Sequence, residues 1–451
     1  MVKSVVTRLW LTVFGFAALL GVGPLSAQSL DAWAGGVKAK HNGATVRVLA
    51  IPHPSSDAMR AMTPDFEKVT GVKVVWEMVG SGDIVPKQML AQTAGDAAYD
   101  VYMVRGVSLA EYDAKQVLAD LGPFIRNATL TPAGYDYEDL APAFRQGLGE
   151  QAGKILGIPV AGESFFISYR KDLFEKYGKK PPETLDDLLA LAKFFQNKEL
   201  GLYGISMRAE TGRTLALTWD LFTPAFGGAI LDQKTWDVKI TTPETLASLK
   251  YLLDLLANAP PDIETYTWDA AVSAFAAGKT AMWFDATSLQ PWIVDPTKSK
   301  VVGKVAYAPP PKGPKGQFGP VGGWSLGLPS IAKNKELAWA FIAWMTAKAN
   351  AKDMVAKGGV PSRLSVLNDP AFIAQDPSMA AALKGSLEAA GNLLALGRRW
   401  VPSTSEATRI HRVAGTFGGQ ALLKKMTPEA AVAAAVPELT EISEKIKKSS
   451  Q

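Results

Sequence analysis

Six charged or hydroxyl residues stand where predicted strands and helices end, and four tryptophans lie near them in the sequence. Carboxylates accept hydrogen bonds from hydroxyl groups, and arginine donates them in a fixed planar arrangement. Tryptophan offers a flat apolar face for the C–H face of a sugar or polyol. This combination favours a polyhydroxylated ligand over a phosphate, which is bound by clustered N–H groups and arginine. The residues are Asp57, Glu163, Ser164, Arg208, Asp285 and Arg363, with Trp219, Trp268, Trp283 and Trp324.

Each candidate also has a purely structural interpretation. Glu163 can cap a turn, and Arg208 and Arg363 can pair with surface acids. Trp283 lies among apolar residues, which fits the core of a strand better than a ligand contact. Trp324 follows two glycines, which allow the backbone and the ring to approach a ligand closely, so it is the strongest aromatic candidate.

The sequence offers no positive sign of catalysis or of a metal site. It contains no Walker A motif and no G-x-S-x-G elbow. No cysteine is present, and none of the histidines, His41, His53 and His411, lies within four residues of another. We therefore expect no enzyme activity, no metal and no cofactor. The alternative, an exported carbohydrate-active enzyme, needs two carboxylates at catalytic separation, one of them with a raised pKa.

Residues 267–287 are the elements that would carry Asp285 to a cleft. Thr267 is a suitable N-cap for a short amphipathic helix, and Gly278 ends it. Residues 280–284 form an apolar, β-prone run that Asp285 closes. The stretch therefore predicts a helix followed by a strand with a carboxylate at its end.

The first part of the chain predicts an alternating α/β pattern. Strands are expected at residues 46–51, 72–78 and 100–104, with helices at 58–69 and 86–94. Such an order favours an open, mostly parallel sheet with right-handed crossovers. Residues 28–44 are small and polar, and we expect a flexible leader there.

Residues 1–27 are predicted to be a signal peptide. Lys3 and Arg8 precede an apolar run over residues 9–22, and small residues at 25–27 offer a cleavage site. Without cysteine the chain has no disulfide and no N-terminal lipid attachment, so we expect a soluble periplasmic protein without a lipid anchor. The net charge of +5 is spread out, and the absence of a zinc pattern or basic stripe argues against nucleic-acid binding.

Several segments, taken in this order, resemble the extracellular solute-binding proteins of ABC importers, in the branch that binds sugars and polyols. The resemblance covers about residues 45–365, and Glu163, Arg208 and Asp285 are most similar to positions of sorbitol- and mannitol-type binders. The resembling segments are residues 66–74, 158–164, 169–174, 275–283, 323–326 and 334–338.

The resemblance implies an α/β, type II-like periplasmic binding protein fold with two lobes, a hinge and a ligand cleft between the lobes. It places lobe one at residues 45–157 plus 286–330 and lobe two at 158–285 plus 331–445. Ligand-driven closure would then present the protein, as a monomer, to the membrane permease subunits.

In that family-based view the ligand-binding residues divide by role. Glu163, Arg208 and Asp285 would hold hydroxyl groups, Trp324 would form the stacking wall, and Arg363 would reach in from the helical lobe. The ligand is open between a polyol, a mono- or disaccharide, and a non-carbohydrate small solute. The full set of predicted contacts is Asp57, Glu163, Ser164, Arg208, Trp268, Trp283, Asp285, Trp324 and Arg363.

Overall fold

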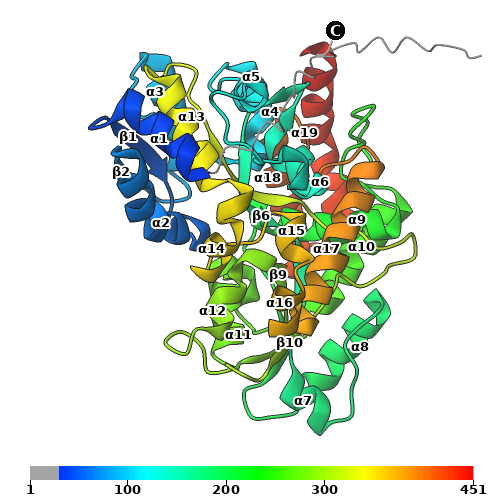
Figure 1. Ribbon diagram of the computed structural model, residues 1–451. Coiled ribbons are helices and arrows are strands. Elements are labelled where there is room, and N and C mark those ends of the chain that lie inside the picture. The colour runs from blue at the N-terminus through cyan, green and yellow to red at the C-terminus, as the bar shows by residue number, and fades with distance from the viewer. Residues whose placement is uncertain (1–29, 450–451) are drawn as a thin grey trace, which may run out of the picture.

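The computed structural model describes residues 30–449 and contains two main β-sheets, each with its own hydrophobic core (Figure 1). The first sheet has the strand order β2-β1-β3-β11-β6, and the second has the order β10-β7-β9-β8; β4 and β5 form a separate hairpin. We call the parts around these sheets the first and the second lobe. The strands are β1 (Thr45–Ala50), β2 (Lys73–Met78), β3 (Val101–Arg105), β4 (Glu150–Gln151), β5 (Lys154–Ile155), β6 (Ile158–Glu163), β7 (Phe165–Arg170), β8 (Tyr203–Ser206), β9 (Thr280–Ala286), β10 (Val305–Ala308) and β11 (Gly322–Gly327).

The predicted two-lobe α/β fold is confirmed, and its N-terminal strands are parallel as expected. β1 pairs in parallel with both β2 and β3. β11 then runs antiparallel to both β3 and β6, and in the second sheet β7 runs antiparallel to β10 and β9. Both sheets are therefore mixed, because only the βαβ units force parallel pairing.

The first lobe buries aromatic residues between its sheet and helices that lie far apart in sequence. Phe66 on α2 contacts Phe341 and Trp344 on α13, with ring centroids 5.4 and 5.5 Å apart. Such rings remove a large apolar area from water and stabilise the lobe. Its helices are α1 (Leu30–His41), α2 (Pro54–Thr70), α3 (Ile84–Ala94), α4 (Leu109–Ala114), α5 (Gly122–Arg126), α6 (Pro142–Phe144), α13 (Lys335–Met345) and α14 (Ala351–Ala356).

The second lobe has a larger, mostly helical shell around its sheet. Trp219 on α9 is fully buried, and its N–H donates to Ser248 Oγ on α10 at 2.8 Å. The short helices α15 (Leu364–Leu367) and α16 (Pro370–Gln375) lead into this lobe. Its helices are α7 (Lys171–Lys176), α8 (Leu185–Phe195), α9 (Arg213–Phe226), α10 (Pro243–Leu256), α11 (Trp268–Ala276), α12 (Gln290–Val294), α17 (Pro377–Ala395), α18 (Ala407–Leu422) and α19 (Pro428–Ser449).

The elements predicted for residues 267–287 are present, with one local difference. Thr267 occupies the N-cap position of α11, but its hydroxyl donates to the Asp269 carboxylate and accepts no hydrogen bond from a helix backbone N–H. The chain leaves the helix through Gly278, whose φ of 78° is a conformation that glycine adopts without strain. β9 follows at once and carries Asp285 next to its last residue.

The prediction of a flexible leader at residues 28–44 is wrong. Residues 30–41 form α1, which buries Trp33, Ala34 and Val37 in the first core. These residues lie close together on one face of the helix, although the small residues around them weaken the periodic signal. The predicted signal peptide at residues 1–27 lies outside the described residues.

The predicted lobe boundaries also need correction. β6 belongs to the first sheet and β7 to the second, so the chain first crosses at Ser164 and not before residue 158. Residues 287–308 belong to the second lobe, because β10 pairs with β7. α13 belongs to the first lobe, because it packs on α2. Strand pairing between distant segments decides these assignments, and sequence order alone does not reveal it.

Candidate ligand-binding site

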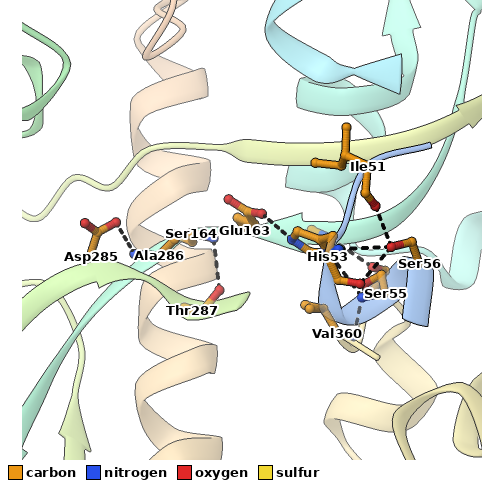
Figure 2. A network of polar contacts seen from close by, with 12 residues as sticks. Ile51, His53, Ser55, Ser56, Glu163, Ser164, Asp285, Ala286, Thr287 and Val360 are labelled. Atoms are coloured by element: carbon orange, nitrogen blue, oxygen red, sulfur yellow. Dashed lines mark hydrogen bonds and ion pairs between the residues drawn. The ribbon is translucent and has the colours of Figure 1, made fainter. Parts of the chain in front are cut away.

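Glu163 lies at the junction of the lobes, at the end of β6, and its carboxylate meets His53 from the N-terminus of α2 (Figure 2). The His53 Nε2 to Glu163 Oε1 distance is 3.2 Å. The Ser55 backbone N–H donates to His53 Nδ1 at 3.1 Å. Because Nδ1 accepts this bond, the neutral imidazole carries its proton on Nε2 and donates it to Glu163. The capping of α2 therefore orients a side chain of the site.

Arg208 and Asp285 form a paired unit on the second-lobe side. β8 and β9 are parallel neighbours, so Asp285 near the carboxyl end of β9 and Arg208 just beyond that of β8 meet at one edge of the sheet. Arg208 Nε donates to Asp285 Oδ2 at 2.9 Å, and Nη2 donates to Oδ1. Burial alone would lower the pKa of Arg208, but the Asp285 carboxylate raises it above its usual value. The pair is a fixed, bidentate donor–acceptor unit.

Arg105 and Trp324 form a second pair, on the first-lobe side. They are register partners on the antiparallel strands β3 and β11, and the guanidinium carbon lies 5.2 Å from the centre of the indole ring. Trp324 is only 8% exposed, so Arg105 and the core cover most of the ring that was predicted to stack on a ligand. Burial lowers the pKa of Arg105, and the nearby Tyr112 and Glu163 partly offset this effect.

The charged groups of the two lobes meet around Glu163. Its carboxylate interacts electrostatically with Arg105 of the first lobe and with Arg208 of the second. A further cation, Arg213 at the start of α9, interacts with both of these arginines. We call these five groups the interlobe charge cluster: Arg105, Glu163, Arg208, Arg213 and Asp285.

An aromatic wall stands beside this cluster. Trp400 packs against Phe165, with ring centroids 5.2 Å apart and planes at 66°. The guanidinium carbon of Arg208 lies 5.1 Å from the centre of the Phe165 ring. The Trp400 N–H donates to the Leu217 carbonyl oxygen at 2.8 Å, which fixes the indole. A side chain at Gly322 would come within 3.4 Å of Trp400 and 3.9 Å of the Glu163 carboxylate, so glycine keeps this corner open.

The sequence analysis missed four of these residues. Arg105 and His53 each follow a predicted strand in the first lobe, which is the same signal that identified Asp285. Arg213 and Trp400 had no such signal, because they lie in segments without a motif. The missed residues are His53, Arg105, Arg213 and Trp400.

Two of the predicted ligand contacts, Trp283 and Ser164, are occupied by interactions within the protein. Trp283 is fully buried in the second core and stacks on Phe275, with centroids 6.4 Å apart, as the core interpretation anticipated. Ser164 donates its hydroxyl to the Ser386 carbonyl oxygen at 3.0 Å, and its N–H donates to Thr287 Oγ1 at 3.3 Å (Figure 2). Ser164 therefore ties the crossing between lobes to α17 and to the end of β9.

Arg363 belongs to the first lobe and does not reach in from the helical lobe. Its Nη1 donates to the Asp136 carbonyl oxygen at 2.7 Å and to Asp139 Oδ2 at 3.3 Å. Its Nε and Nη2 both donate to the Thr346 carbonyl oxygen. The side chain is 3% exposed, so these protein acceptors take up its donors.

Asp57 and Trp268 lie outside the cluster. Asp57 is exposed on α2 and pairs with Arg60, with the Oδ1 and Nη1 atoms 3.6 Å apart. Trp268 is half-buried at the start of α11 and packs on Trp292, with centroids 5.5 Å apart. Both have ordinary surface or packing roles in this conformation.

A large cavity of about 710 Å³ opens between the β4–β5 hairpin and the C-terminal end of α17. Arg145, Glu150, Arg398 and Arg399 contribute to its lining. It adjoins a small cavity that Trp400 lines together with residues following β3 and preceding β11. The large open volume therefore lies beside the small cavity that Trp400 lines.

Two kinds of structural feature are absent from residues 30–449. No group of three or more histidine, cysteine, aspartate or glutamate side chains in this range is placed to hold a metal ion. In the same range no helix has the length and apolar character required to cross a bilayer.

Comparisons with known proteins agree with this architecture. A family of bacterial extracellular solute-binding proteins matches residues 52–352. A probable amino-acid ABC transporter periplasmic-binding protein of Sinorhizobium fredii is 26% identical over 428 residues, which cover 92% of this chain and 94% of the relative. An erythritol/L-threitol-binding protein of Mycolicibacterium smegmatis is 25% identical over 352 residues, which cover 73% of this chain and 72% of the relative.

A solved structure is also similar. The ABC transporter solute-binding protein of Agrobacterium radiobacter, in complex with ribitol, superimposes with a TM-score of 0.78 at 26% identity. The match covers 89% of this chain and 99% of that protein. The family match extends over well more than half of the sequence. The chain belongs to the bacterial extracellular solute-binding proteins of ABC transporters.

Proposed function

We propose that this chain is the substrate-binding subunit of an ABC importer and that it captures a sugar alcohol or sugar between its two lobes. The single observation that carries the proposal is the meeting of Glu163, at the end of the first sheet, with the Arg208–Asp285 pair of the second. A ligand that bonds to both sides at once favours the closed arrangement of the lobes. Two similar proteins support this ligand class: the erythritol/L-threitol-binding protein and the solute-binding protein that was solved in complex with ribitol.

The residue chemistry supports a polyhydroxylated ligand. Glu163 and Asp285 present charged acceptors for hydroxyl hydrogens, while Arg105 and Arg208 present donors for hydroxyl oxygens. Hydrogen bonds to charged groups contribute more than neutral ones and fix each hydroxyl in direction. Phe165 and Trp400 supply an apolar wall for C–H groups. Trp324 would contribute only after Arg105 moves from its ring.

Binding is favoured over catalysis because the carboxylates are already engaged. Asp285 is held by two bonds from Arg208, and Glu163 accepts a bond from His53. A glycosidase needs one carboxylic acid that can give its proton to the leaving group. Asp285 is instead a fixed acceptor for both donors of a bidentate arginine. We infer a monomeric, periplasmic protein without a lipid anchor, consistent with a sequence that has no cysteine.

The test is a thermal-shift and calorimetric screen with ribitol, erythritol, mannitol, maltose and a set of amino acids. A true ligand at about 1,000 times its dissociation constant stabilises the protein by about 4 kcal/mol, which is a clear shift in Tm. We expect a shift with a polyol or sugar and a smaller radius of gyration with that ligand bound. A response restricted to amino acids would refute the ligand class, and turnover of a bound sugar would refute the binding role.

A further inference from the structure

The interlobe charge cluster contains one more cation than anion. Arg208 is neutralised by Asp285, which leaves Glu163 as the one carboxylate of the cluster for two further arginines. Within residues 30–449, neither Arg105 nor Arg213 has a carboxylate oxygen within 4.0 Å. Arg105 donates to the Ser81 carbonyl oxygen and lies over Trp324, so it has a neutral partner.

Arg213 is the arginine of the cluster that has no hydrogen-bond or ion-pair partner among the residues that the structure describes. Its Nε is buried from solvent and makes no hydrogen bond to any described residue. Glu210, the nearest acid before it in sequence, is exposed and accepts a bond from the Thr214 hydroxyl at 2.9 Å. Burial, together with repulsion from Arg105 and Arg208, lowers the pKa of Arg213 to about 10.

The position of Arg213 at a helix N-terminus adds to the electrostatic repulsion that its positive charge experiences. It is the first residue of α9, where the helix dipole already presents positive charge. A helix N-terminus favours acidic side chains, and the cap residue Gly212 offers no side-chain acceptor. A glutamine or methionine would fill the same space without the electrostatic penalty. Arg213 is half-buried, and its enclosed Nε has no acceptor among the described residues, so the guanidinium is expected to serve a bound anion.

We propose that the preferred ligand is an acidic polyol, such as an aldonate, whose carboxylate binds Arg213 and Arg105 while its hydroxyl groups bind Glu163, Arg208 and Asp285. The proposal rests on the proposed function and narrows its ligand class. A carboxylate accepts from guanidinium groups in a planar, two-bonded geometry that a hydroxyl cannot match. One negative charge would also balance the cluster. Because Arg105 and Arg213 come from different lobes, the same carboxylate would draw the lobes together.

The test compares matched ligands that differ only at one terminal carbon. D-gluconate is compared with sorbitol, and D-ribonate with ribitol, by calorimetry on the protein without its predicted signal peptide. We expect at least one acid to bind ten-fold or more tightly than its neutral partner, with affinity falling as salt increases. Hexanoate, which has the carboxylate without the hydroxyls, should not bind measurably.

Two variants separate a specific contact from general attraction. Arg213→Gln should bring the ratio of acid affinity to neutral-polyol affinity down to about one, while Arg213→Lys should restore part of that ratio. Arg409→Gln, which removes a surface charge from the same lobe, should leave both affinities unchanged. Folding of each variant is checked by its Tm without ligand.

The outcomes distinguish the two proposals. Neutral polyols that bind as tightly as their acids would overturn the carboxylate proposal and leave the proposed function intact. Equal losses for both ligands in Arg213→Gln would also overturn it. A protein that binds neither member of either pair would overturn the carboxylate proposal, and a lack of response to erythritol, mannitol and maltose as well would overturn the proposed function.

Discussion

Two arginine–aspartate pairs in this protein have different surroundings. Arg363 donates to Asp139 and also to two backbone carbonyl groups, and it is 3% exposed. Arg208 donates to Asp285 alone, with its side chain 15% exposed. The first guanidinium is saturated by its own lobe, whereas the second faces charges from the other lobe. This unused bonding capacity at the lobe junction is why we propose Arg208, and not Arg363, as a ligand-binding group.

Arg363→Met should have the largest effect on stability. It leaves Asp139 and the Asp136 and Thr346 carbonyl groups without their buried donor. Removing one partner from such a pair costs about 3–5 kcal/mol. Urea unfolding should show this loss, while the folded fraction keeps its ligand affinity. A loss below about 1 kcal/mol would remove the distinction between the two pairs.

Asp285→Asn should have the largest effect on binding. The variant keeps the shape but loses the charged acceptor, and Arg208 loses its fixed orientation. A hydrogen bond to a charged group contributes about 1.5–3 kcal/mol, so the dissociation constant should rise about 10- to 150-fold. The dissociation constant is measured by calorimetry with the ligand found in the screen. Unchanged affinity with lowered stability would make this pair structural, like that of Arg363.

Glu163→Gln should weaken binding less, because His53 and the backbone of β6 still hold the side chain in place. The glutamine keeps one acceptor oxygen but loses the negative charge that faces Arg105 and Arg208. We expect a loss of about 1–2 kcal/mol in binding free energy, measured by calorimetry. An unchanged dissociation constant would assign Glu163 to structure alone.

Trp400→Phe should have the smallest effect. The ring still packs on Phe165, but the hydrogen bond to the Leu217 carbonyl oxygen is lost. We expect a cost of about 1 kcal/mol in unfolding free energy, with a similar or smaller loss of affinity. A loss of binding far greater than the loss of stability would show that the indole itself touches the ligand.

The sequence analysis succeeded where a local pattern decides the outcome. The helix–strand unit ending at Asp285 and the pairing of β1, β2 and β3 follow from periodicity and stop signals. The sequence analysis did not predict the helix α1, because its apolar face is short and lies among small residues. Arg363 was misjudged because no local feature tells that Asp139 and Thr346 lie beside it.

By itself the sequence predicted the α/β class, because strand ends and helix caps are set by neighbours along the chain. Its resemblance to known solute-binding proteins supplied the two lobes, the family and the prediction that Glu163, Arg208 and Asp285 share one site. Only the tertiary structure decided the lobe boundaries, the core position of Trp283 and the charge balance around Arg213. Such properties depend on which distant segments pair, and electrostatic balance in a buried site sums over groups that the sequence scatters across both lobes.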